Sequence, residues 1–243
     1  MLRSLVGALL GVWLCLCLSN ASAQDRSTHM QLLLERLSKS ATAEDYAQIQ
    51  EAIQASSVVE DELKQLADSG KLKNILVRPK SQCPGCQFGG FENNGQFIFT
   101  REFLQALKRN RVYDVVYADD IAPNNTVFAL AHLIHHVKNP VDFSKFNNPT
   151  DYSEGRLLVE AECFLVGWNA MVGAAQAANG NKPLSPRQTG QLLVNSRYQF
   201  PFVGKGMDGE KLQWLDDGRF AIDAKNKKIV ADVLRNSPMA DLR

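Results

Sequence analysis

Three histidines gather in one short apolar stretch and constrain the local fold more than any other feature of this chain. His132, His135 and His136 lie in the run FALAHLIHHVKNP, and the polar residues at 124–126 can cap the start of a helix there. Residues four apart project from the same side of a helix, so His132 and His136 should point the same way. The aliphatic residues fall on the other side, which predicts that they pack on a sheet while the histidines face a cleft.

The spacing of His132 and His136 indicates metal binding. It is the spacing of the zinc-binding His-Glu-x-x-His helix, in which both imidazoles hold the metal and the Glu is the general base. In this chain Leu133 stands at the position of that Glu. Leucine cannot accept or donate a proton, whereas a well-placed general base contributes about 10²–10⁴-fold to a reaction rate. The sequence therefore predicts a metal-binding helix without the usual base.

Regular structure is predicted on both sides of this helix. Residues 28–71 have the pattern of three helices, and short strands are expected at 73–79 and 96–99, separated by a glycine-rich loop. A long helix from 154 to 178 carries Glu160 and Glu162. These two side chains are about 200° apart on a helical wheel, so only one of them can turn toward a given metal.

The order of strand, histidine helix and Glu-bearing helix resembles the core of the zincin metallopeptidases, in the subgroup with a Glu as third zinc ligand. The resemblance covers about residues 73–178, and it implies that His132, His136 and Glu160 bind zinc. Glu160 is the implied ligand because Glu160-Ala161-Glu162 matches the family's Glu-Ala run from its first residue. The implied fold is α+β and mostly helical, with a small mixed sheet packed on the histidine helix and a second, Glu-bearing helix, within one domain over residues 24–243.

Three functions remain open at this stage. The first is an exported, zinc-binding homologue of these peptidases that is catalytically weak or inactive and holds a peptide or protein partner along an edge strand at residues 97–99. The second is a working zinc hydrolase in which His135, next to a ligand, substitutes for the missing base. The third is an exported scaffold protein without metal.

Export is expected from the first 23 residues. A basic start at Arg3, an apolar run from Leu5 to Leu18 and the small residues at 21–23 are typical of a secretory signal peptide. We therefore expect a periplasmic or secreted protein that has no membrane segment after cleavage. Cleavage would remove only Arg3 among the charged residues, leaving 26 basic and 26 acidic side chains. This balance gives no electrostatic reason to expect nucleic acid as a partner.

Three cysteines would remain after cleavage. In an oxidising compartment, Cys83 and Cys86 are first expected to form a disulfide that closes a small loop. Half of a zinc site and a thioredoxin-like redox pair are the other interpretations of this Cys-x-x-Cys spacing. Cys163 lies in an apolar helical run, which predicts a small buried side chain.

Overall fold

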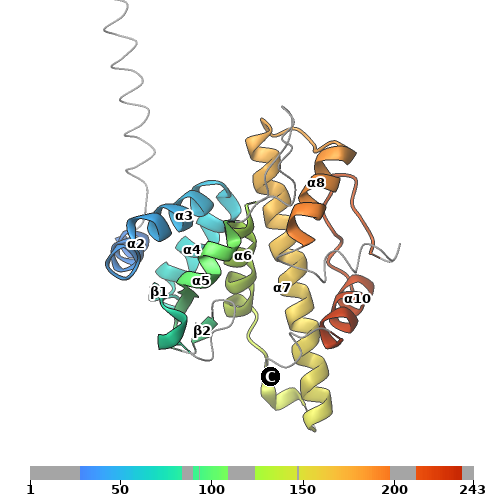
Figure 1. Ribbon diagram of the computed structural model, residues 1–243. Helices are drawn as coiled ribbons and strands as arrows, with labels where there is room; N and C mark the ends of the chain where they lie inside the picture. The colour runs from blue at the N-terminus through green and yellow to red at the C-terminus, as the bar shows by residue number, and fades with distance from the viewer. Residues whose placement is uncertain are drawn as a thin grey trace, which may run out of the picture.

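The computed structural model describes residues 28–83, 90–92, 94–108, 124–146, 148–197 and 212–236, and these form a mostly helical α+β fold (Figure 1). The expected signal peptide lies outside the described residues. In chain order the elements are α2 (Thr28–Ser40), α3 (Ala43–Gln54), α4 (Ser57–Asp68), β1 (Asn74–Arg78), the 3₁₀ turn η1 (Lys80–Gln82), β2 (Gly90–Glu92), β3 (Gln96–Thr100), α5 (Arg101–Leu107), α6 (Asn125–Lys138), the 3₁₀ turn η2 (Phe143–Lys145), α7 (Pro149–Ala178), α8 (Pro186–Arg197) and α10 (Ala224–Arg235).

The sheet is small and mixed, in the order β1-β3-β2, with β1 parallel and β2 antiparallel to β3. The sheet corrects two expectations, that residues 97–99 form an edge strand and that the glycine-rich stretch between the two expected strands is a loop throughout. Residues 97–99 belong to the central strand rather than to an edge, and they are buried. The reason is β2, which lies within the stretch that glycine content assigned to a loop and which pairs with the open side of β3. Residues 96–98 of β3 are therefore paired on both sides and cannot take a partner strand.

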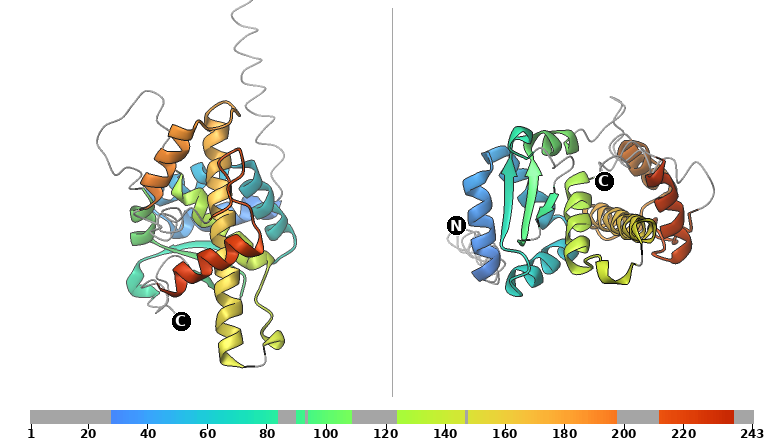
Figure 2. Two further views of the ribbon diagram at one scale, coloured as in Figure 1. Left: turned by 90° about the vertical axis from the view of Figure 1, so that its right-hand side faces the viewer. Right: turned by 90° about the horizontal axis from the view of Figure 1, so that it is seen from below.

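The elements stack in layers, which Figure 2 shows from below (right panel). Helix α2 covers one side of the sheet, where it packs on β1, and α6 covers the other side next to β2. Helix α7 packs on the far side of α6, and α10 packs on α7. The α+β class and the packing of a sheet, a histidine helix and a Glu-bearing helix are thus as the sequence predicts.

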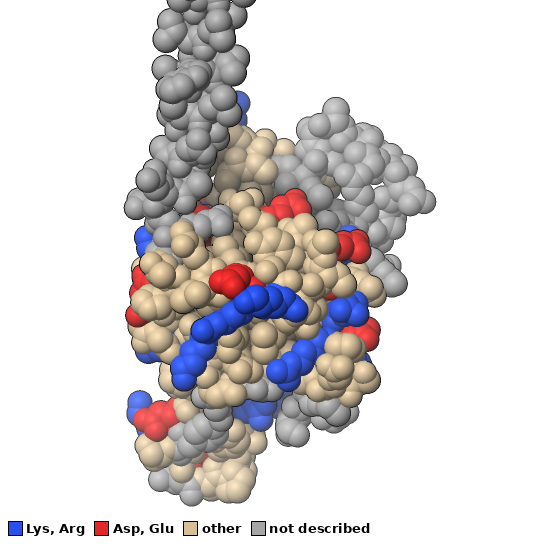
Figure 3. Space-filling view, turned by 90° about the vertical axis from the view of Figure 1, so that its left-hand side faces the viewer, with Lys and Arg blue, Asp and Glu red and all other residues tan. Residues whose placement is uncertain are grey.

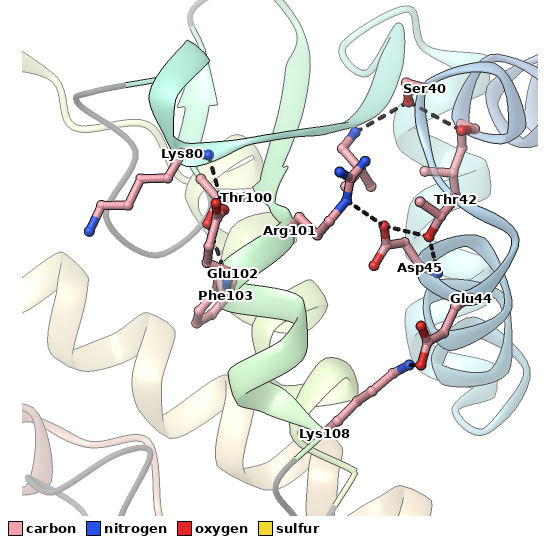
Figure 4. A network of polar contacts seen from close by, with 12 residues as sticks. Ser40, Thr42, Glu44, Asp45, Lys80, Thr100, Arg101, Glu102, Phe103 and Lys108 are labelled. Carbon is pink, nitrogen blue, oxygen red and sulfur yellow. Dashed lines mark hydrogen bonds and ion pairs between the residues drawn. The ribbon is translucent and has the colours of Figure 1, made fainter.

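A polar network holds α3 against the start of α5 (Figure 4). The carboxylate of Asp45, 4% exposed, accepts hydrogen bonds from Thr42 Oγ1 at 2.7 Å and from Arg101 Nε at 3.3 Å. Lys108, two helical turns after Arg101, forms an ion pair with Glu44 at 2.5 Å. The buried Asp45 carboxylate thus has a cationic partner, so the network joins the helix pair without leaving that charge unpaired.

Helices α6 and α7 run antiparallel and approach closely at Gly167. A Cβ atom at Gly167 would lie 3.0 Å from the backbone oxygen of Phe128, so any larger side chain would push the two helices apart. By length and composition alone α7 could cross a membrane, but half of its apolar window is buried inside the protein. This burial is what a core helix of a folded domain requires.

Candidate metal site

All three clustered histidines lie on helix α6, in one region of the molecule. Asn124 caps the helix, with its side-chain oxygen accepting a hydrogen bond from the backbone N–H of Val127 at 3.2 Å. Val127, Leu130 and Ile134 are fully buried, as the helical wheel predicts. The histidine side faces α7, whose Phe164 ring lies 4.6 Å from that of His132.

His132 and His136 meet Glu160 of α7. The Oε2 atom of Glu160 lies 3.4 Å from Nε2 of His132 and 3.3 Å from Nε2 of His136, and the two nitrogens are 3.1 Å apart. The structure thus brings together the three residues that the sequence singled out as metal ligands, and they form a group able to hold a metal ion. Their side chains are 16%, 22% and 31% exposed, so the group is reachable from solvent.

The size of this triangle matches tetrahedral coordination. Ligand atoms about 2.0–2.1 Å from a zinc ion lie about 3.3 Å from one another when the geometry is tetrahedral. The three observed separations are 3.1, 3.3 and 3.4 Å. The same separations are within reach of hydrogen bonds between the rings and the carboxylate. Two imidazole nitrogens and one carboxylate oxygen at these distances form a group that could hold a metal ion.

The charge states in this group suit metal binding. Burial lowers the pKa of His132 and outweighs the opposing effect of Glu160, so the ring is held in its neutral, metal-binding form. Burial works to raise the pKa of Glu160, but contacts with His132 and His136 outweigh it, and the pKa lies below its ordinary value. The group therefore offers the neutral ring of His132 beside the carboxylate of Glu160.

The Nδ1 atom of His132 lacks the outer hydrogen bond that is usual for a zinc-bound histidine. Zinc-bound histidines commonly donate a hydrogen bond from the second ring nitrogen to a carboxylate or a carbonyl oxygen. Among the described residues, the buried Nδ1 of His132 has no such partner. Loss of such an outer hydrogen bond typically costs 10–100-fold in metal affinity, so we expect a metal site of less than maximal strength.

His135 lies in a different set of contacts. Its Nε2 is 3.3 Å from Glu162 Oε1, and the other oxygen of Glu162 is 3.1 Å from Nζ of Lys227 on α10. Burial lowers the pKa of His135, opposed by the negative charge of Glu162. Glu162 thus contacts His135 and Lys227 and does not join the metal group, as its position on the wheel predicts. Lys227 was not singled out from the sequence, because nothing in the local pattern of α10 indicates that it reaches α7.

Expectations from the sequence also concern Leu133 and the cysteines, and the structure describes three of these residues. Leu133, at the position of the missing base, is 6% exposed and belongs to the hydrophobic core. Cys163 is a free, buried thiol, as predicted, and burial together with nearby carboxylates raises its pKa. Cys83 is disulfide-bonded, but Cys86 lies outside the described residues, so their pairing stays a prediction.

Comparison with known proteins adds no relative: no protein-family model, no curated protein and no solved structure matches this chain. The geometry of the site is therefore the basis for assigning a function to this chain.

Proposed function

We propose that this chain is an exported zinc-binding protein related in design to the zincin peptidases, with weak or no peptidase activity. The observation that carries the proposal is the triangle of donor atoms from His132, His136 and Glu160, whose edges of 3.1–3.4 Å fit tetrahedral coordination. Two imidazoles and one carboxylate with an open fourth position are the donor set of many zinc hydrolases. The same donors are poorly suited to Mg²⁺ or Ca²⁺, which favour oxygen ligands.

Leu133 supports the second half of the proposal. A bound zinc ion would polarise a peptide carbonyl, but peptide hydrolysis also needs a group that passes a proton to the leaving amine. Leu133 cannot serve, and His135 is already in contact with Glu162. A protein of this kind would hold a peptide or protein partner at the open metal position more readily than it would cleave it.

The metal content of the purified mature protein tests the proposal. We expect about one zinc ion per chain in the wild type and a large loss in His132→Ala. His29→Ala is a matched control, because His29 lies on α2 and contacts Asp68 instead of the triad. Wild-type protein that neither retains nor takes up zinc would leave the metal-free scaffold as the better interpretation.

A peptidase assay with a chelator control separates the inactive protein from a working hydrolase. We expect little or no cleavage by the wild type, and a gain in zinc-dependent cleavage by Leu133→Glu. The gain is limited because Leu133 is buried, so an ionised side chain there costs stability. Robust, chelator-sensitive cleavage by the wild type that is abolished in His135→Ala would favour the hydrolase with a substitute base. Cleavage that survives His135→Ala would require another proton-transfer group.

A further inference from the structure

Glu160 stands at the point where α7 leaves the body of the protein. No residue from Pro149 to Glu160 is buried, whereas Ala161 and several residues after it are. Helix α6 ends at Lys138, two residues after His136, so the first three turns of α7 extend beyond it. We call residues 149–160 the α7 arm; it forms the lower end of α7 in Figure 1.

The arm is attached at several points among the described residues, where Leu157 packs against the hydrophobic core and the Tyr152 ring lies 5.8 Å from that of Phe146. Its Glu154 forms an ion pair with Arg235 of α10, and the ring of Phe146 packs where a Cβ atom of Gly155 would lie. Helix α10 is itself held to α7, through Lys227 and Glu162 at one end and Arg235 and Glu154 at the other. The arm and α10 therefore support each other. The main contact between these two segments and the sheet side of the molecule is the packing of α7 on α6 (Figure 2).

The candidate metal group lies across this joint. His132 and His136 belong to α6, which packs on the sheet side of the molecule, and Glu160 is the last residue of the arm. Without a metal, the contact consists of polar atoms 3.1–3.4 Å apart that are partly exposed to solvent. A metal would replace it with three coordinate bonds that break when the arm unwinds, because unwinding carries Glu160 away from the histidines.

We propose that metal binding controls the order of the α7 arm, so that the site acts as a metal-dependent staple between α6 and the α7–α10 layer. This inference rests on the proposed zinc site but does not follow from it, because a metal can bind without changing local order. The arm would be firmly helical when zinc is bound and would unwind more often when zinc is removed. Any partner that contacts the arm would then sense the metal.

Hydrogen exchange of the full chain, followed by mass spectrometry with zinc and with a chelator, tests the proposal. If opening of the arm breaks the site, exchange of the backbone amides at 153–160 should slow about 100-fold at free zinc 100 times Kd. In zinc-free protein the same amides should exchange much faster than those of β1 and α3, since the arm would open without unfolding the core. Glu160→Gln should abolish the zinc effect, whereas Glu162→Gln, two residues along the same helix, should retain it.

Zinc binding is measured on the same samples, so that the two proposals can fail separately. Bound zinc with unchanged exchange at 153–160 would overturn the staple and leave the zinc site standing. Exchange at 153–160 that is as slow as in β1 and α3 without zinc would also overturn it, because the arm would then open only when the whole fold unfolds. An absence of zinc binding would overturn both.

Discussion

Two polar clusters in this molecule are each built around a carboxylate and differ in the side chains that surround it. Around Asp45 (Figure 4), Thr42 and Arg101 both donate hydrogen bonds to one carboxylate oxygen. Around Glu160, two histidine nitrogens and one carboxylate oxygen converge, and each of the three can act as a lone-pair donor. The first cluster is satisfied by its own hydrogens, whereas the second, in our proposal, is completed by a cation. The groups around the carboxylate make the difference, because a guanidinium and a hydroxyl donate hydrogens to it whereas a neutral imidazole can offer a lone pair to a metal.

The distribution of charged side chains on the surface does not distinguish a structural cluster from a metal site. Figure 3 shows the α2 side of the molecule, where Lys and Arg side chains lie among Asp and Glu. On α2 itself Lys39 pairs with Glu35 at 2.6 Å, and both side chains are more than half exposed. Exposed pairs of this kind contribute little to stability and mark no site.

The largest expected effect is the response of the Glu160 cluster to zinc. At free zinc 100 times Kd, the free energy of unfolding of the wild type should rise by about 2.7 kcal/mol. Glu160→Gln should remove this rise, because it replaces the charged ligand by a neutral amide of the same shape. Urea denaturation with zinc and with chelator measures both. An equal rise in the variant would mean that the ion binds somewhere else.

The Asp45 cluster should respond to mutation and ignore zinc. Asp45→Ala leaves Arg101 without its buried partner, which costs several kcal/mol when both charges are buried. The Arg101 side chain is 38% exposed, so solvent screens part of the loss and we expect about 2 kcal/mol. The same denaturation experiment should give the same loss with zinc and with chelator. A loss that depends on zinc would break the distinction between the two clusters.

The pairing of the two histidines was predictable because it depends on short-range spacing: a separation of four residues places His132 and His136 on one side of a helix. The wheel predicts that only one of Glu160 and Glu162 faces them, and the choice of Glu160 comes from the resemblance to the zincins. Helix bounds were also predictable from caps and apolar periodicity. The long helix nevertheless starts at Pro149, five residues before the expected Glu154, because Asn148 caps it.

Features that depend on distant pairing were not predictable in this way. The strand at 96–99 is central only because β2, a three-residue strand in a glycine-rich stretch, pairs with it. A strand so short has no recognisable alternation. The contact of Lys227 with Glu162 joins residues 65 positions apart, and no local pattern encodes it. The same limit applied to Asp45 and Arg101, which are 56 positions apart.

A smaller effect concerns the pH range over which the metal group is ready to bind. Burial lowers the pKa of His132 below the ordinary 6.5, so its ring should stay neutral at pH values where an exposed histidine has begun to gain a proton. Proton competition with zinc at this ligand therefore begins only as the pH falls through the lowered pKa. NMR titration of the His132 ring in zinc-free protein should give a midpoint below 6.5. A midpoint at or above that value would show that the charge of Glu160 outweighs burial.

The smallest expected effect separates Glu162 from the metal group. Lys227→Met removes the ion pair with Glu162, whose two side chains are 29% and 31% exposed, so the loss of stability should be about 0.5 kcal/mol. Zinc affinity should not change, because Glu162 projects away from His132 and His136 and keeps its contact with His135. Calorimetric titration of zinc into wild type and variant measures the affinity, and urea denaturation measures the stability. A change in affinity of tenfold or more would place Glu162 and its partners within the metal site and would end the contrast between a satisfied cluster and a metal-binding one.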